Sequence, residues 1–277
     1  MAINKTHIRS ISLQSRSHPS ILQIEQQLNK IRTCESSATP NAETISNGLC
    51  GLVELYISMD DFLNLPQSLQ AFAKYQNAKW VDEILDCPVQ LLDVCGITKD
   101  ILSQFKGNVR DLQSSLRRRK GDLSVEAFIT NYTSFRNKMT KVAKRCISTL
   151  KKMDHAMEAT ILDMDQEVSS IIRVVREVNA LTISIFQSVL AFLSKTRSSK
   201  WSFAKLIVNK SRVSCEGQQV NLNELEVVDN ALSKNSSTMQ QDLGQLEASI
   251  EGIEKGLESM TRCLIRSRTL LLNVVSC

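Results

Sequence analysis

The chain has 277 residues and a formal net charge of +5, with 42% hydrophobic and 23% charged residues. These values are close to those of average globular proteins, so they exclude a chain that stays disordered for lack of apolar residues, and a membrane channel does not fit them either. The four prolines all lie in the first third of the chain, and glycine occurs only nine times. Because short strands joined by tight turns need both residue types, the composition predicts long helices.

Cysteine and histidine follow no metal-binding pattern. The eight cysteines form no C-x-x-C pair and the three histidines lie apart from any cysteine cluster, so no metal centre is predicted. Residues 1–20 contain no apolar leader, and we therefore expect an intracellular protein with reduced thiols. The cytoplasm is the compartment that we favour. The first acidic residue is Glu25, so an organellar transit peptide is an alternative.

Residues 1–19 are basic and rich in serine, and we expect them to form a flexible N-terminal tail. Ser12 follows Arg9 by three positions and Ser10 by two, a pattern that basophilic kinases phosphorylate. Ser10 and Ser12 are therefore candidate phosphorylation sites, which an arginine-lined adaptor could bind.

Residues 20–277 are predicted to form a single helical domain. Two shorter helices come first, over residues 20–32 and 45–63. Pro88 predicts a kink or a new helix start, for which Asp86 is an available cap.

Four longer segments repeat apolar residues at alternating spacings of three and four, which is typical of helices that bury one face. They cover residues 84–116, 128–157, 161–192 and 225–264. Four such heptad seams in one chain predict an all-α fold, an elongated antiparallel helical bundle with coiled-coil-like packing.

Two interruptions of the helical pattern are predicted in the second half of the chain. A long loop is expected over residues 195–221, and Asn221 with Glu224 forms a candidate capping pair for the helix that follows. Residues 233–238, SKNSST, are expected to break the last helix.

Charge is distributed unevenly along the chain. Residues 110–152 contain twelve Lys/Arg and three acids, whereas residues 216–260 contain nine acids and two lysines. We expect a basic and an acidic helix that attract each other within the fold, with a cationic surface as the alternative.

The densest basic cluster is Arg117, Arg118, Arg119 and Lys120. Adjacent cations of this kind occur in nuclear-localisation and phosphate-binding segments. They also stabilise the C-terminus of a helix, and Gly121 can end it, so we favour the structural interpretation. Nucleic-acid binding is not expected, because Tyr132 and Phe135 lie on the apolar seam and are not available to stack on bases.

Residues 178–194 contain no charge, but their polar residues and continued heptad spacing favour a buried bundle helix over a membrane span. The adjacent loop places Lys200, Trp201, Phe203 and Lys205 together, as a partner or membrane-surface contact would. The alternative that we favour is a loop whose aromatic side chains cap the end of the bundle.

The search for catalytic motifs is negative. The sequence contains no Gly-rich phosphate loop, no H-E-x-x-H and no G-x-S-x-G. His155 is the single histidine beyond the tail, on a predicted solvated turn. We therefore predict no catalytic, cofactor-binding or metal-binding residue and no small-molecule substrate, and we expect that the protein is not an enzyme.

Four segments together resemble a known family. They are RSISLQSRSHP (9–19), WVDEILDCPVQLLDVCGITKDIL (80–102), DLQSSLRRRKGD (111–122) and RCLIRSRTLLLNVVSC (262–277). In this order, over nearly the whole chain, they resemble the plant-specific BYPASS-related family of uncharacterised helical proteins. The resemblance implies a protein of root and shoot development with no established enzymatic activity, and it supplies no catalytic residues.

We therefore expect a non-enzymatic helical interaction or scaffold protein, whose helix faces and tail bind protein partners that the sequence does not identify. The alternative is a peripheral membrane protein that docks through the basic aromatic loop around Trp201 and the apolar helix over 178–194.

Overall fold

The structure, a computed structural model, describes residues 18–37, 41–74, 79–118, 123–157, 166–195, 222–234 and 238–276. Within these ranges the chain forms eight α-helices and no strand, so the predicted all-α class is confirmed.

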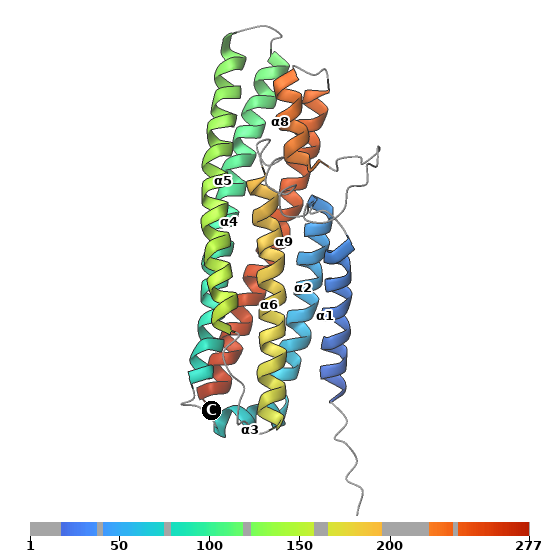
Figure 1. The fold of residues 1–277 in the computed structure, drawn as a ribbon, viewed down its shortest axis with the longest axis vertical. Helices are drawn as coiled ribbons and strands as arrows, with labels where there is room; N and C mark the ends of the chain where they lie inside the picture. Colours follow the sequence, from blue (N-terminus) through green and yellow to red (C-terminus); the bar gives the residue numbers. More distant parts are fainter. Residues whose placement is uncertain are drawn as a thin grey trace, which may run out of the picture.

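The helices are α1 (Pro19–Ser37), α2 (Ala42–Leu63), α3 (Pro66–Lys74), α4 (Lys79–Arg118), α5 (Leu123–Met157), α6 (Gln166–Ser194), α8 (Glu224–Lys234) and α9 (Met239–Ser276). Figure 1 shows the long helices side by side along one axis, with the short α3 at one end of an elongated bundle. At about 1.5 Å per residue, the 40 residues of α4 extend over about 60 Å.

The described apolar positions of α4 lie on a buried face of the helix. In α4, positions spaced by three and four, from Ile84 through Phe105 to Leu112, are buried, whereas Asp100 and Arg110 are exposed. Helix α9 packs against α2, α4 and α8, and α6 packs against α1, α2 and α5. The buried side chains of all these helices form one continuous hydrophobic core.

Helices α2 and α9 approach each other closely at Gly256. A Cβ atom on this residue would lie 2.8 Å from Cδ1 and 3.0 Å from Cβ of Leu49. A side chain at this position therefore forces Leu49 or the helix that carries it to move.

Helix α6 contains the apolar stretch at 178–194, and it is the one helix among the described residues that is long and apolar enough to cross a membrane. Most of its side chains are buried inside the bundle, including Val178, Leu190 and Leu193. This position agrees with the interpretation of a core helix.

Helix α4 continues through Pro88, so the predicted new helix start at this residue is wrong. Asp86 is consequently an exposed residue of the helix interior and not a cap. Proline in a helix interior costs about 3 kcal/mol. Pro88, Cys87 and Leu91 are all buried, so packing of both halves of α4 against the same core opposes this cost.

The cap of α8 lies two residues beyond the predicted pair Asn221 and Glu224. Asn223 Oδ1 accepts a hydrogen bond from the backbone N–H of Glu226 at 2.8 Å, and Glu226 Oε2 accepts from the backbone N–H of Asn223 at 3.1 Å. This reciprocal capping box starts the helix at Glu224. The predicted break before the last helix agrees with the ends of α8 at Lys234 and of α9 at Met239.

Candidate functional site

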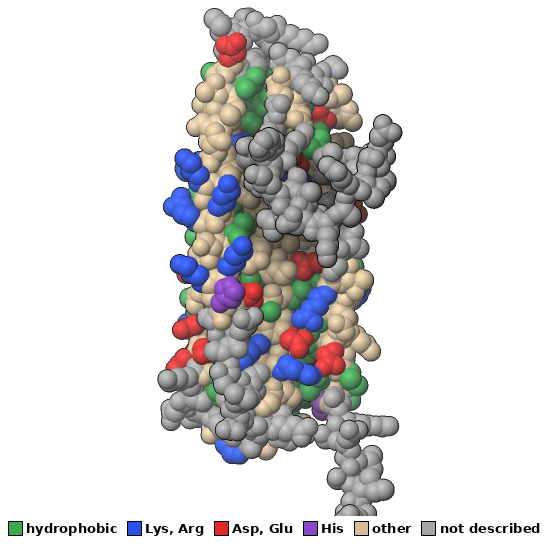
Figure 2. Space-filling view, viewed as in Figure 1, with side chains coloured by type: hydrophobic (Ala, Val, Ile, Leu, Met, Phe, Trp, Pro, Cys, Tyr) green, Lys and Arg blue, Asp and Glu red, His purple; other side chains and the backbone are tan. Residues whose placement is uncertain are grey.

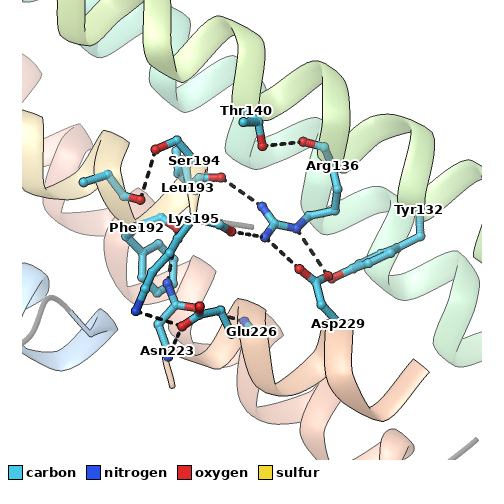
Figure 3. A network of polar contacts seen from close by, with 11 residues as sticks. Tyr132, Arg136, Thr140, Phe192, Leu193, Ser194, Lys195, Asn223, Glu226 and Asp229 are labelled. Atoms are coloured by element: carbon cyan, nitrogen blue, oxygen red, sulfur yellow. Dashed lines mark hydrogen bonds and ion pairs between the residues drawn. The ribbon is translucent and has the colours of Figure 1, made fainter. Parts of the chain in front are cut away.

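Among the residues that the structure describes, an extensive and largely buried polar network surrounds Arg136 of α5 (Figure 3). The Arg136 side chain is 4% exposed. Its Nε and Nη2 donate to the Asp229 carboxylate of α8 at 3.4 and 2.9 Å. Its Nη1 donates to the Leu193 carbonyl at 2.9 Å, and Nη2 also donates to the Lys195 carbonyl at 2.7 Å.

These contacts place Arg136 at the C-terminal end of α6, which ends at Ser194. The last carbonyls of a helix lack partners within the helix and carry the negative end of its dipole. The guanidinium satisfies two of these carbonyls, and the carboxylate of Asp229 balances its charge. Four of its five N–H groups thus bond to the protein itself.

Tyr132 completes the network, since its hydroxyl donates to Oδ1 of Asp229 at 2.9 Å. Burial raises the pKa of Tyr132 well above its usual value, and the charge of Asp229 raises it further. The hydroxyl therefore stays neutral at physiological pH and acts as a hydrogen-bond donor. The ring lies against Phe105 of α4, with ring centroids 5.5 Å apart, so the network is anchored to the core.

A second group of contacts adjoins the first one and joins the end of α6 to the start of α8. Lys195 Nζ lies 2.8 Å from Oε2 of Glu226. Asn223 Nδ2 donates to the Phe192 carbonyl at 3.3 Å. Together with Arg136, these contacts hold both described ends of the segment 196–221 beside α5.

Another buried carboxylate lies between α2 and α9. Asp60 is 2% exposed, and its Oδ2 accepts from Nε of Arg266 at 3.1 Å. Burial raises the pKa of Asp60 to about 6, against the opposing effects of Arg266 and the Ser267 hydroxyl. A protein usually places such a carboxylate either at a functional site or in an internal ion pair.

An open groove of about 490 Å³ lies between the α2–α3 junction and α9, and Arg266 lines it. Asn64, Thr269 and Asn273 supply neutral polar groups to its wall, and Arg266 is the one titratable side chain among its lining residues. The groove therefore presents no pair of acid and base groups of the kind that general acid–base catalysis uses.

The described cysteines are free, and several are buried. Burial raises the pKa of Cys87 to about 12 and also raises that of Cys95. A buried neutral thiol is a poor nucleophile. Within the part of the chain that the structure describes, no three His, Cys, Asp or Glu side chains are grouped so that they could hold a metal ion.

Only some of the described Lys and Arg side chains in the basic region 110–152 form ion pairs with the acidic region 216–260. Arg110 pairs with Glu247 of α9, and Arg136 pairs with Asp229 of α8. The six other cations of α5 between residues 138 and 152 are exposed and form no ion pair with a described residue. Helix α5 therefore carries a cationic surface, which the sequence predicts as the alternative to attraction between a basic and an acidic helix.

Most of the predicted site residues lie outside the described residues. These are Ser10, Ser12, Arg119, Lys120, Lys200, Trp201, Phe203 and Lys205. Arg117 and Arg118 are exposed in the last turn of α4, where cations complement the helix dipole. His155 is exposed in the last turn of α5.

Sequence reasoning missed the Arg136 network. Its one local signal is an arginine directly after the seam residue Phe135, at the edge of an otherwise apolar face. The partner Asp229 is 93 residues away and has no motif around it.

The fold and the network define an all-helical bundle protein in which an extensive, largely buried polar network fastens helix ends. The chain belongs to the BPS1 family, whose model, described as Protein BPS1, matches residues 48–274. This match confirms the resemblance to a BYPASS-related plant family, and membership points to a role in plant development. No curated protein matches the chain, and no solved structure matches it.

Proposed function

We propose that this protein is a non-enzymatic helical interaction protein that acts in root and shoot development by presenting its outer helix faces to partners. The observation that carries the proposal is the Arg136 network, in which four of the five N–H groups of the guanidinium bond to the chain's own atoms. A polar site already filled in this way stabilises the fold and has little hydrogen-bonding capacity left for a substrate.

The second polar cluster supports the same proposal. The buried Asp60 pairs with Arg266, an exposed residue that is also the one titratable side chain lining the groove beside it, so the groove has no acid and base pair. The buried thiols are neutral at physiological pH, because burial raises the pKa of Cys87 and Cys95. The groups available to other molecules are therefore those on the outer faces.

Proximity labelling in root tissue, followed by direct binding with the purified full chain, tests this proposal. We expect at least one labelled neighbour to bind the purified chain, and substitution of exposed helix residues to weaken that binding without lowering the melting temperature. The proposal is overturned if no labelled neighbour binds directly, or if the purified chain converts a metabolite from root extract.

A further inference from the structure

The exposed cations of α5 gather on one side of the helix and form what we call the cationic face. They are Lys138, Lys141, Lys144, Arg145, Lys151 and Lys152. Spacings of three, four and seven place residues 138, 141, 145 and 152 in one stripe, which is about 21 Å long at 1.5 Å per residue. Figure 2 shows a row of Lys and Arg side chains along this side of the molecule.

Its own helix offers few acids to this face: residues 127–153 contain no Asp or Glu, and Asp154, three residues after Lys151, lies at the end of the helix. None of its six cations pairs with a described residue of another helix. The opposite side of α5, with Met139, Ala143 and Leu150, is buried against the rest of the bundle. The cationic face is therefore held outward by the packing of the helix that carries it.

The face also lacks apolar anchors. The large hydrophobic residues that the described surface exposes belong to other segments: Leu22, Ile57, Ile97, Leu222, Ile265 and Leu272. The aromatic residues of α5 point inward, since Tyr132 and Phe135 both lie against Phe105. The face can thus attract an anionic surface, but it has nothing to insert into an apolar one.

We propose that the cationic face of α5 docks on the anionic phospholipid headgroups of a membrane surface. Four to eight Lys or Arg residues on one helix face are typical of segments that bind anionic lipids, because each cation is attracted by the negative surface potential. A ridge on the outside of a long bundle can lie along a flat surface over its whole length. Five of the six cations are lysines, whose ammonium groups act as hydrated point charges and need no fixed geometry of phosphates.

The lysine-rich composition of the cationic face disfavours two other anionic partners, an acidic protein and a single-stranded nucleic acid. Lysine is depleted in the cores of protein–protein interfaces, which rely on Trp, Tyr and Arg anchors that this face does not have. Single-stranded nucleic acid binding uses exposed aromatic platforms, and the aromatic side chains of α5 are packed inward. The inference goes beyond the proposed function and does not depend on it.

Vesicle sedimentation with the purified full chain tests the inference. The test variant carries Lys141→Gln, Arg145→Gln and Lys152→Gln. The matched control carries Lys30→Gln, Lys255→Gln and Arg262→Gln on α1 and α9. Each variant removes three exposed positive charges. In the control, Lys255 and Arg262 pair with Glu251 and Glu258 one turn away, whereas the three cations of the test variant pair with no described residue.

We expect the wild-type chain and the control to bind vesicles of phosphatidylcholine mixed with phosphatidylserine, and not vesicles of phosphatidylcholine alone. The test variant should bind at least about tenfold more weakly, and binding should decrease as ionic strength rises above about 0.15 M. Melting temperatures of both variants should stay close to that of the wild type, because exposed substitutions change stability little.

Three results overturn the inference. The first is that the wild-type chain does not bind phosphatidylserine vesicles at low salt. The second is equal loss of binding in the test variant and the control, which would indicate net charge and not the cationic face. The third is binding to a short nucleic-acid duplex or a polyglutamate peptide under conditions in which the vesicles are not bound.

Discussion

The buried Arg136 of α5 and the half-buried Asp229 of α8 form an ion pair in which Nη2 lies 2.9 Å from Oδ2. A buried ion pair contributes little net stability compared with an apolar pair of the same size, since both charges lose their hydration. Removal of one partner is far more costly, because the other charge remains buried and unpaired. Arg136 also satisfies two carbonyls at the end of α6, so its loss affects three helices at once.

Arg136→Met should therefore lower the free energy of unfolding by about 3 to 5 kcal/mol, as expected for breaking a buried pair. Urea denaturation followed by circular dichroism measures the change. Lys138→Met, two residues away on the exposed side of the same helix, is the control and should change stability by no more than about 0.5 kcal/mol. Equal effects of the two substitutions would show that the ion pair does not fasten the bundle.

The contact of Gly256 with Leu49 gives a second prediction. Alanine in place of glycine stabilises an unconstrained helix by about 1 kcal/mol. Gly256→Ala should nevertheless lower the melting temperature, because the new Cβ would lie 2.8 Å from Cδ1 of Leu49.

Gly244→Ala in the same helix is the matched control. A Cβ at Gly244 would meet nothing within 4 Å, so this substitution should raise the melting temperature. A stabilising effect at both positions would contradict the close approach of α2 and α9.

The buried carboxyl of Asp60 predicts a dependence of stability on pH. Its pKa of about 6 in the folded protein is higher than the value of about 3.9 that is usual for Asp in an unfolded chain. The folded state therefore binds the proton more tightly, and the contribution of this group to stability is lost as pH rises from about 4 to about 6.

Asp60→Asn removes this titration and should stabilise the protein at neutral pH by up to about 3 kcal/mol, the equivalent of a shift of about two pKa units. The difference in unfolding free energy between variant and wild type should grow from about pH 4 to about pH 6, the pKa values of Asp60 in the unfolded and folded states. Above about pH 6 the difference should stay constant. A difference that is independent of pH would mean that Asp60 is not desolvated in the folded state.

The long helices could be predicted from the sequence because their apolar spacing is itself the cause of their packing. The start of α8 could not, because the pattern N-x-x-E occurs twice, at Asn221 with Glu224 and at Asn223 with Glu226. Tertiary contacts decide between them: Glu226 pairs with Lys195, and Glu224 Oε1 accepts from the backbone N–H of Ala42 at 3.2 Å.

Asn223→Ala should accordingly destabilise the protein by about 1 kcal/mol, the usual effect of losing a helix cap. Asn221→Ala serves as the control and should be neutral within about 0.5 kcal/mol. Thermal denaturation of the two variants measures the difference, and a larger effect at Asn221 would favour the cap that the sequence alone suggested.

The candidate site was less accessible to sequence reasoning than the fold. The heptad pattern identifies which side of α5 is buried, but it gives no reason to expect Arg136 there. Arg136 is tolerated because Asp229 and the end of α6 form hydrogen bonds with it in the folded protein. Both partners are far from Arg136 in the sequence. Pro88 shows the same limit, since only packing on both sides explains why α4 continues through it.

We propose that outer helix faces carry the function, while the buried polar groups hold the fold. Rescue of root and shoot development in a plant line that lacks the gene tests it most directly. We expect Asp60→Asn and Tyr132→Phe, which remove buried titratable groups with little change of shape, to restore development. The triple substitution of Lys141, Arg145 and Lys152 should fail to restore development while the chain stays folded. Rescue by the triple variant, or failure of a folded Asp60→Asn or Tyr132→Phe variant, would contradict this proposal.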